Sequence, residues 1–333
     1  YSGDVLPLAG RVNDVMLQKQ LLIHRFGFNP KDIITLTDSQ ATRKGILTAF
    51  EEHLINQAKP GDTVVFHFSG HGGRVLDPDK DSPDGYNSTL IPIDIQSNSS
   101  GGEVEDIMGH TLFMLMYALK TDNVTMVLDS CHSGGAKRGN FVVRSRGSSK
   151  KLQVSPKEIE YQRQWLKRLN LSPQEFIRLR RQNIAKGVVI ASAKREQLAL
   201  DAAFDDFSAG AFSYLFTQYL WQQPQNQSAK RIIVDVSRST NIYSEREGYN
   251  QIPEIETNTK PSNPPLYFTP FNTNYAEAVV TNISGNQVEL WLGGVDSESL
   301  AAFEKDAVFT VADGGGRGFV KLESRQGLVG KGR

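Results

Sequence analysis

The chain has 333 residues and carries 37 Lys and Arg against 37 Asp and Glu, so its formal net charge is zero. This balance provides no net attraction to nucleic acid or to an anionic membrane. No apolar run approaches the roughly 18 residues of a membrane span, and the single cysteine cannot form an internal disulfide. We therefore expect a monomer of a reducing cytoplasm, with no nucleic-acid or membrane partner.

Apolar residues recur at helical spacing in some segments and form short runs between turn residues in others. In chain order they predict a helix over 13–25 capped by Asn13, a strand over 33–37, a helix from Ser39 or Thr42 to 56, a strand over 63–68, a polar loop over 70–102, a helix over 106–120 and a strand over 124–128. A mobile basic loop over 134–153, helices over 156–167 and 173–186, a strand over 187–191 and a helix over 209–221 follow.

Strands that alternate with helices predict an α/β fold with a mostly parallel sheet flanked by helices. The pattern changes near residue 271, where short alternating runs such as 288–292 and 307–311 are separated by Gly-rich turns. We therefore predict two domains, an α/β domain over 1–270 and a small β-rich domain over 271–333.

Polar and glycine residues follow two of the predicted buried strands. The stretch that contains His71 comes after the strand at 63–68, and the stretch that contains Cys131 comes after the strand at 124–128. The carboxyl ends of parallel strands meet at one edge of a sheet, where sites form. We therefore expect His71 and Cys131 to lie side by side.

These residue types indicate nucleophilic catalysis. A thiolate is the reactive form of cysteine, and an imidazole close by can take up or return the proton. Gly72 lets the backbone approach a substrate carbonyl closely. The N–H groups of Gly72 and Cys131 are candidates for the oxyanion hole.

Two other interpretations compete with this one. A lone cysteine is often a small buried hydrophobe, but Cys131 lies among polar residues and glycines, beyond the strand. Zinc could also bind to His67, His71, Cys131 and His132. Structural zinc usually has closely paired ligands, and His67 lies inside a strand, so this alternative is weaker.

The motifs at residues 69–72 (SGHG) and 129–134 (DSCHSG) resemble those of the metacaspases, and among them the prokaryotic orthocaspases, within the caspase-like cysteine peptidases. Residues 8–14, 84–85 with 90–92, and 251–253 are similar to further family patterns. The resemblance covers about residues 5–268. It implies a caspase-hemoglobinase fold, and a peptidase with His71 and Cys131 as its catalytic dyad.

The resemblance also implies cleavage after Arg or Lys, because the S1 pocket of the family is acidic. The matching positions are Asp14, Ser69 and Asp129, and carboxylates at the base of a pocket bind a guanidinium and repel an acidic side chain. Arg11 departs from the family pattern and could pair with Asp14, which leaves the charge of the pocket open.

Many metacaspases use calcium, but here the family's Asp-Gly-x-Asp-Glu is Asp84-Gly85-Tyr86-Asn87-Ser88, followed by Glu105 and Asp106. Fewer carboxylates weaken a calcium site. We therefore expect activity without calcium and no metal or other cofactor. Asp77, Asp79, Asp81 and Asp84 are interpreted as a solvated loop.

A basic stretch follows the cysteine, and an Arg-specific enzyme could cut itself there. We propose 144–151 as the processing zone, with Arg144, Arg146, Lys150 and Lys151 as candidates. The alternative is an ordinary solvated insertion. The family also has an apolar strand ahead of the position of Tyr1, and we expect the full protein to contain it.

The sequence therefore predicts a cysteine endopeptidase that acts on peptides and proteins with a basic residue before the cleaved bond. Two rival functions remain. One is a non-catalytic caspase-like interaction module, and the other is a peptidase of the same fold with Asp or Asn specificity.

Overall fold

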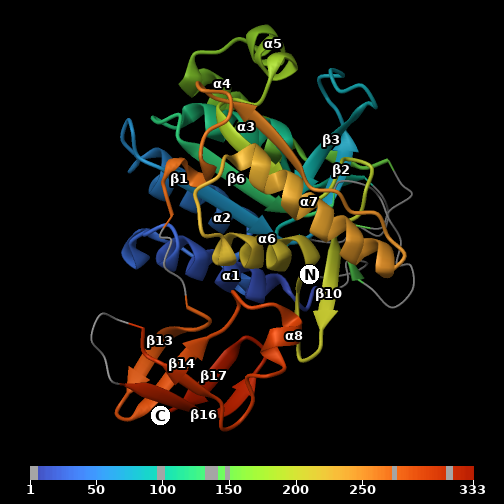
Figure 1. Cartoon of the computed structure of the whole chain (residues 1–333). Coiled ribbons are helices and arrows are strands. Elements are labelled where there is room, and N and C mark those ends of the chain that lie inside the picture. Colours follow the sequence, from blue (N-terminus) through green and yellow to red (C-terminus); the bar gives the residue numbers. More distant parts are fainter. Residues whose placement is uncertain (1–6, 96–101, 132–141, 147–150, 272–275, 313–317) are drawn as a thin grey trace.

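The computed structural model describes residues 7–95, 102–131, 142–146, 151–271, 276–312 and 318–333. Its centre is a four-stranded sheet in the order β1-β6-β9-β12. The strands β1 (Val64–Ser69), β6 (Val124–Asp129) and β9 (Gly187–Ala191) are parallel, and β12 (Glu254–Asn258) is antiparallel to β9. The predicted α/β class with a mostly parallel sheet is confirmed (Figure 1).

Helices cover both faces of this sheet. Val127 of β6 belongs to one core cluster and its neighbours Met126 and Leu128 belong to another, as the alternation of side chains along a strand requires. On the Val127 face lie α1 (Arg11–His24), α6 (Ala211–Gln222) and α7 (Ala229–Arg246). On the other face lie α2 (Arg43–Ala49), η3 (Phe50–Ile55), α3 (Gly109–Ala118), α4 (Pro156–Leu169) and α5 (Pro173–Gln182).

Side-chain caps start several of these helices. The side chain of Thr42 accepts from the Gly45 N–H, so Thr42 is the cap of α2 and Ser39 is not. Ser155 and Ser172 cap α4 and α5 ahead of their first-turn prolines, as predicted. The expected cap of α1 was wrong, because Asn13 lies inside that helix and its amide donates to the Ser208 carbonyl at 2.7 Å.

Three smaller sheets contain strands that the sequence analysis did not predict. The predicted polar loop over 70–102 contains β2 (Gly72–Leu76) and β3 (Tyr86–Leu90), which form a sheet with β5 (Ile107–Met108). A second sheet joins β11 (Phe207–Gly210), β10 (Leu200–Phe204) and β7 (Val142–Val143), and a third pairs β4 (Glu103–Val104) with β8 (Gln153–Val154). The prediction of a mobile loop is therefore wrong for 142–146, because that stretch pairs with a strand far away in the sequence. Short helical turns are η1 (Pro30–Asp32), η2 (Asp38–Gln40) and η4 (Leu266–Phe268).

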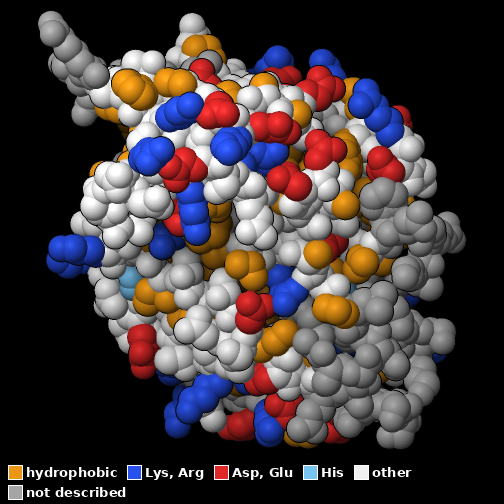
Figure 2. Space-filling model, turned by 90° about the horizontal axis from the view of Figure 1, so that it is seen from below, with side chains coloured by type: hydrophobic (Ala, Val, Ile, Leu, Met, Phe, Trp, Pro, Cys, Tyr) orange, Lys and Arg blue, Asp and Glu red, His pale blue; other side chains and the backbone are white. Residues whose placement is uncertain are grey.

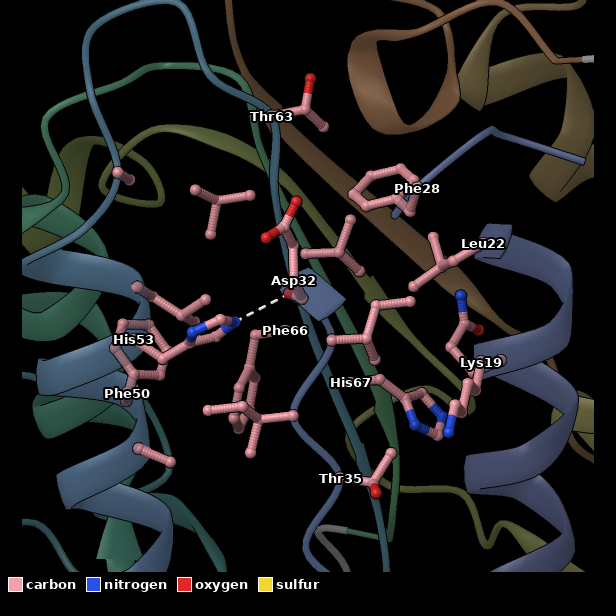
Figure 3. A pocket seen from close by; sticks show the side chains of 18 of the residues that line it. Lys19, Leu22, Phe28, Asp32, Thr35, Phe50, His53, Thr63, Phe66 and His67 are labelled. Carbon is pink, nitrogen blue, oxygen red and sulfur yellow. Dashed lines mark hydrogen bonds between the residues drawn. The ribbon is translucent and has the colours of Figure 1, made fainter. Parts of the chain in front are cut away.

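A cavity of about 690 Å³ lies along β1, on the side away from β6. Figure 3 shows Lys19 and Leu22 of α1 on one side, Phe50 and His53 on the other, and His67 of β1 between them. The predicted strand over 33–37 is absent as a strand, and residues 33–36 line this cavity instead. They have no strand partner within the described part of the chain.

A five-stranded antiparallel sheet forms the C-terminal region, in the order β13-β14-β17-β16-β15. Its strands are β13 (Val279–Ser284), β14 (Gln287–Trp291), β15 (Val308–Thr310), β16 (Phe319–Gln326) and β17 (Val329–Gly332), with α8 (Ser297–Leu300) between β14 and β15. It packs below α1 and α6 in Figure 1, where the rings of Trp291 and Trp221 meet with centroids 4.9 Å apart. The predicted β-rich C-terminus is confirmed.

No helix among the described residues is long and apolar enough to span a membrane. On the face seen in Figure 2, acidic and basic side chains are interspersed and no extended area of one sign is visible.

Candidate active site

The register of the central sheet brings His71 and Cys131 to the same edge. Ser69 at the end of β1 pairs with Asp129 at the end of β6, and each of the two candidate residues follows two positions later. Both side chains are buried, with 1% of His71 and none of Cys131 exposed. The structure thus brings together the two loops that the sequence predicted to be neighbours.

The Cys131 thiol contacts the backbone of Ala199. Its Sγ accepts the Ala199 N–H at 2.7 Å and lies 3.3 Å from the Ala199 carbonyl oxygen. Burial raises the pKa of Cys131 to about 12; the Ala199 N–H opposes this shift and the charge of Asp129 adds to it. In this arrangement the group is a protonated thiol near neutral pH.

Residues 142–146 of the chain cross this site, and the first two of them form the short strand β7. Val142 and Val143 pair antiparallel with Asp201 and Leu200 of β10. The N–H of the next residue, Arg144, donates to the Ala199 carbonyl at 3.0 Å. An extended segment on a sheet edge is one of the recurring ways in which a protein binds a peptide.

The carbonyl oxygen of Arg144 accepts two hydrogen bonds, from the N–H groups of Gly72 and Cys131, each at 3.0 Å. These are the two donors that the sequence analysis named for an oxyanion hole. The approach is close, since a Cβ on Gly72 would lie 2.0 Å from the Cys131 carbonyl oxygen. Only glycine allows this arrangement at position 72.

The side chain of Arg144 is fully buried in an acidic pocket. Nη2 lies 2.6 Å from Asp14 and 2.8 Å from Asp201, and Nη1 lies 3.4 Å from the Asp129 carboxylate. Nη1 also donates to the Ser69 hydroxyl, which in turn donates to Asp14 at 2.5 Å. The three positions predicted for the S1 pocket therefore surround one guanidinium.

Charge and burial oppose one another in this pocket. Burial disfavours the charged guanidinium, but Asp129, Asp14 and Asp201 outweigh it and raise the pKa of Arg144 above its ordinary value. Burial raises the pKa of Asp14 to about 6, although Arg144 acts in the opposite direction. The pocket is thus strongly acidic and suited to a basic side chain.

Asp201 is a pocket residue that the sequence analysis missed. It lies on β10, a strand that was not predicted, and its carboxylate also accepts the N–H groups of Ala9 and Gly10. The open question about Arg11 is answered, because Arg11 pairs with Asp38 at 2.7 Å on the surface and leaves Asp14 to Arg144.

The other candidates of the processing zone differ in their surroundings. Arg146 pairs with the buried Asp106, at 2.7 Å and 3.1 Å from its two oxygens, whereas Lys151 is exposed. Lys150 lies outside the described residues, as does His132. Of the candidates that the structure describes, only Arg144 has its carbonyl at the Gly72 and Cys131 N–H groups.

The residues at the family's calcium positions do not fit a calcium ion in this arrangement. Asp106 is held by Arg146 and by the Thr89 hydroxyl. Asp84 pairs with Arg195 at 2.8 Å, and Glu105 pairs with Lys157 at 2.6 Å on the surface. The carboxylates that remain at these positions already have cationic partners.

A second acidic group lies in the 77–81 loop, where ligand atoms of Asp77, Asp79, Asp81 and His110 lie within 4.8 Å of one another. Arg180 of α5 pairs with Asp79 at 2.8 Å and with Asp81 at 2.9 Å. The Asp77 side chain is buried, with 5% of its surface exposed, so the interpretation of this loop as solvated is wrong for Asp77.

Relatives of this chain are metacaspases. It is 30% identical to Metacaspase-1 of Schizosaccharomyces pombe over 66% of this chain and 57% of that protein. It is 30% identical to Metacaspase-1 of Scheffersomyces stipitis, over 68% and 62% of the two chains, and 28% identical to that of Meyerozyma guilliermondii, over 77% and 67%. The chain thus spans between half and two thirds of the length of these relatives.

A more distant likeness is to the crystal structure of a protein from Geobacter sulfurreducens, with a TM-score of 0.41 and 20% identity over 71% of this chain and 80% of that chain. The family model described as "Metacaspase, peptidase C14 domain" matches residues 1–137, which include both candidate catalytic residues. By these comparisons the chain is similar to the metacaspases.

Proposed function

We propose that this chain is a cysteine endopeptidase that cleaves after Arg and first processes itself at the Arg144–Ser145 bond. The observation that carries the proposal is the position of Arg144, whose side chain fills the acidic pocket while its carbonyl accepts the Gly72 and Cys131 N–H groups. A segment held in this way has the contacts of a bound substrate.

In this reaction His71 accepts the thiol proton and the Cys131 sulfur attacks the carbonyl carbon of Arg144. The Gly72 and Cys131 N–H groups stabilise the negative charge that develops on the carbonyl oxygen. His71 then returns the proton to the Ser145 nitrogen as the peptide bond breaks. Water hydrolyses the acyl-enzyme, which frees the Arg144 carboxylate and restores the thiol.

Preference for Arg over Lys follows from the geometry of the pocket. Nη1 and Nη2 contact different acceptors, Ser69 and Asp129 on one side and Asp14 and Asp201 on the other. A planar fork reaches both sides at once, whereas an ammonium is a single point of charge. The same carboxylates repel Asp and disfavour Asn before the cleaved bond, which argues against that rival specificity.

The test is intact-mass analysis of the purified chain beside Cys131→Ala, Arg144→Lys and Arg144→Gln. We expect wild type to separate between Arg144 and Ser145, Arg144→Lys to process more slowly, and the other two to remain whole. Because the segment lies in its own site, the rate should not depend on protein concentration. A wild-type chain that stays whole, or that is cut equally in Arg144→Gln, contradicts the proposal.

A non-catalytic interaction module remains the second candidate, and the buried thiol with its raised pKa is the observation that favours it. Cleavage assays with fluorogenic peptides distinguish the two functions. The peptides carry Arg, Lys, Asp or Asn directly before the fluorogenic group. Cleavage after Arg that Cys131→Ala abolishes supports the peptidase. Failure to cleave any of them, in folded and processed protein, supports the module.

We also infer that activity does not need calcium, because Arg146, Arg195 and Lys157 already neutralise the carboxylates at the family's calcium positions. Cleavage should continue in excess chelator; loss in chelator that calcium restores contradicts this inference. The orthocaspase assignment, the monomeric state and the cytoplasmic location stay predictions, and light scattering tests the second of them.

A further inference from the structure

The pairing of Arg146 with Asp106 has the geometry of a binding subsite. Two guanidinium nitrogens of Arg146 meet the two carboxylate oxygens of Asp106, at 2.7 Å and 3.1 Å. Such fork-to-fork pairs combine charge with directional hydrogen bonds, so they discriminate among side chains.

Asp106 is part of the body of the protein and is held in place without Arg146. It lies between β4 and β5 with no exposed surface. The Thr89 hydroxyl of β3 donates to its Oδ2 at 2.6 Å. The carboxylate therefore has a fixed position on the sheet that begins at Gly72, next to the candidate catalytic loop.

The position of Arg146 relative to the cleaved bond is also fixed. The N–H of Gly72 donates to the Arg144 carbonyl at 3.0 Å, while the Gly72 carbonyl accepts the Arg146 N–H at 3.1 Å. One glycine thus binds the backbone on both sides of the Arg144–Ser145 bond. Arg146 is the second residue after that bond, the position called P2′.

We propose that Asp106, positioned by Thr89, is a P2′ subsite through which this enzyme selects substrates with Arg or Lys two residues after the cleaved bond. The proposal rests on the proposed function and extends it from one recognised basic residue to two. The substrate class is then peptides with a basic residue before the bond and another at P2′.

Burial explains why this subsite discriminates. A carboxylate removed from water and left without a cation is unfavourable, and no other Lys or Arg contact to Asp106 is present among the described residues. A neutral P2′ side chain leaves that charge unpaired, and an acidic one adds repulsion. A basic one restores the pair that Arg146 makes in the uncleaved chain.

The experiment uses internally quenched peptides with a common sequence and Arg before the cleaved bond, which differ only in Arg, Lys, Gln or Glu at P2′. They are tested on processed wild type, Asp106→Asn and Arg146→Gln. Glu105→Gln is the matched control, since Glu105 is the neighbouring carboxylate but points to Lys157 on the surface. The readout is the ratio of kcat/KM between peptides within one preparation, which cancels a general loss of activity.

We expect Arg at P2′ to exceed Gln by about 10- to 100-fold in wild type, Glu105→Gln and Arg146→Gln, and the ratio to fall close to one in Asp106→Asn. Equal cleavage of the Arg and Gln peptides by Arg146→Gln, whose subsite is empty, overturns the proposal. The proposal is also overturned if the ratio of kcat/KM between the Arg and Gln peptides is the same in Asp106→Asn as in wild type. If none of the peptides is cleaved, the proposed function itself fails, and that result differs from cleavage without P2′ preference.

Discussion

The Arg144 guanidinium lies 2.6 Å from the Asp14 carboxylate, although 130 residues separate them along the chain. The pocket is built from α1, β1, β6 and β10, and the residue that fills it comes from the segment that follows the candidate nucleophile. In the uncleaved chain Arg144 therefore occupies the candidate S1 pocket. Under the proposed function, an external substrate binds there only after Arg144 has left.

Asp201→Asn tests the pocket residue that only the structure revealed. Loss of one charged partner of the guanidinium should lower kcat/KM for peptides with Arg before the cleaved bond by about 10- to 100-fold. One Asn oxygen can still accept both the Ala9 and Gly10 N–H groups, so the unfolding temperature of the processed chain, in which Arg144 has left the pocket, should change little. Peptide kinetics and thermal unfolding are the two measurements.

The control for Asp201→Asn is Asp38→Asn. Asp38 also pairs with an arginine, Arg11, but on the surface. Surface pairs contribute little to stability and lie outside the pocket, so this variant should match wild type. Equal kinetics for Asp201→Asn and Asp38→Asn would mean that Asp201 does not recognise the substrate.

The pKa of Asp14, about 6 with Arg144 bound, predicts a pH dependence of KM. The guanidinium favours the charged form of Asp14, so the pKa in the empty pocket lies higher than in the filled one. Binding of Arg therefore releases a proton, so KM should rise as the pH falls through the higher pKa of the empty pocket and should level off below about 6. The measurement is KM between pH 5 and 8 in wild type and Asp14→Asn. A rise of equal size in the variant would contradict this assignment.

Gly72→Ala should disturb the oxyanion donors. The new Cβ would lie 2.0 Å from the Cys131 carbonyl oxygen, so the two loops must separate and the N–H groups lose their alignment. We expect kcat to fall by roughly 10²- to 10³-fold with a smaller change in KM, because the S1 contacts remain. Steady-state kinetics on a short Arg peptide give both numbers. An unchanged kcat would remove Gly72 from the oxyanion hole.

The cavity along β1 predicts the effect of an added strand. Alternate residues along β1 bond toward β6: the Val64 N–H donates to the Asn123 carbonyl just before β6, and the N–H of Gly70, just after β1, donates to Asp129. The backbone groups of Val65, His67 and Ser69 therefore face the cavity side. An apolar strand joined ahead of residue 1 could pair with that edge and cover the apolar lining formed by Leu22 and Phe50.

We expect such a strand to raise the unfolding temperature by roughly 5 °C or more, because it buries apolar surface and pairs backbone groups that have no strand partner among the described residues. A Gly- and Ser-rich extension of equal length is the control and should leave the temperature unchanged. An equal rise in the unfolding temperature with both extensions, or no rise with either, would contradict the prediction. Differential scanning calorimetry on the two chains is sufficient.

The sequence by itself determined which residues reach the edge of the sheet. Apolar runs that end in glycine and polar residues are local patterns, so the ends of β1 and β6 were predictable to within a residue or two. From these strand ends the sequence also predicted that His71 and Cys131 lie close together and that the Gly72 and Cys131 N–H groups are the oxyanion donors. The acidic positions 14 and 129 and the polar Ser69 came from the family resemblance.

The tertiary structure decided what fills and completes the site. Residues 142–143 become the strand β7 only because β10, which pairs with β11 on its other side, offers an edge. The contacts with β10 bring Asp201 to Arg144, and the hydrogen bond from the Arg146 N–H to the Gly72 carbonyl brings Arg146 to Asp106. Pairing between segments that are far apart depends on backbone hydrogen bonds and burial across the fold. Local composition does not encode such pairing, so the sequence did not show that Arg144, in a basic stretch that reads as a loop, lies in the candidate active site.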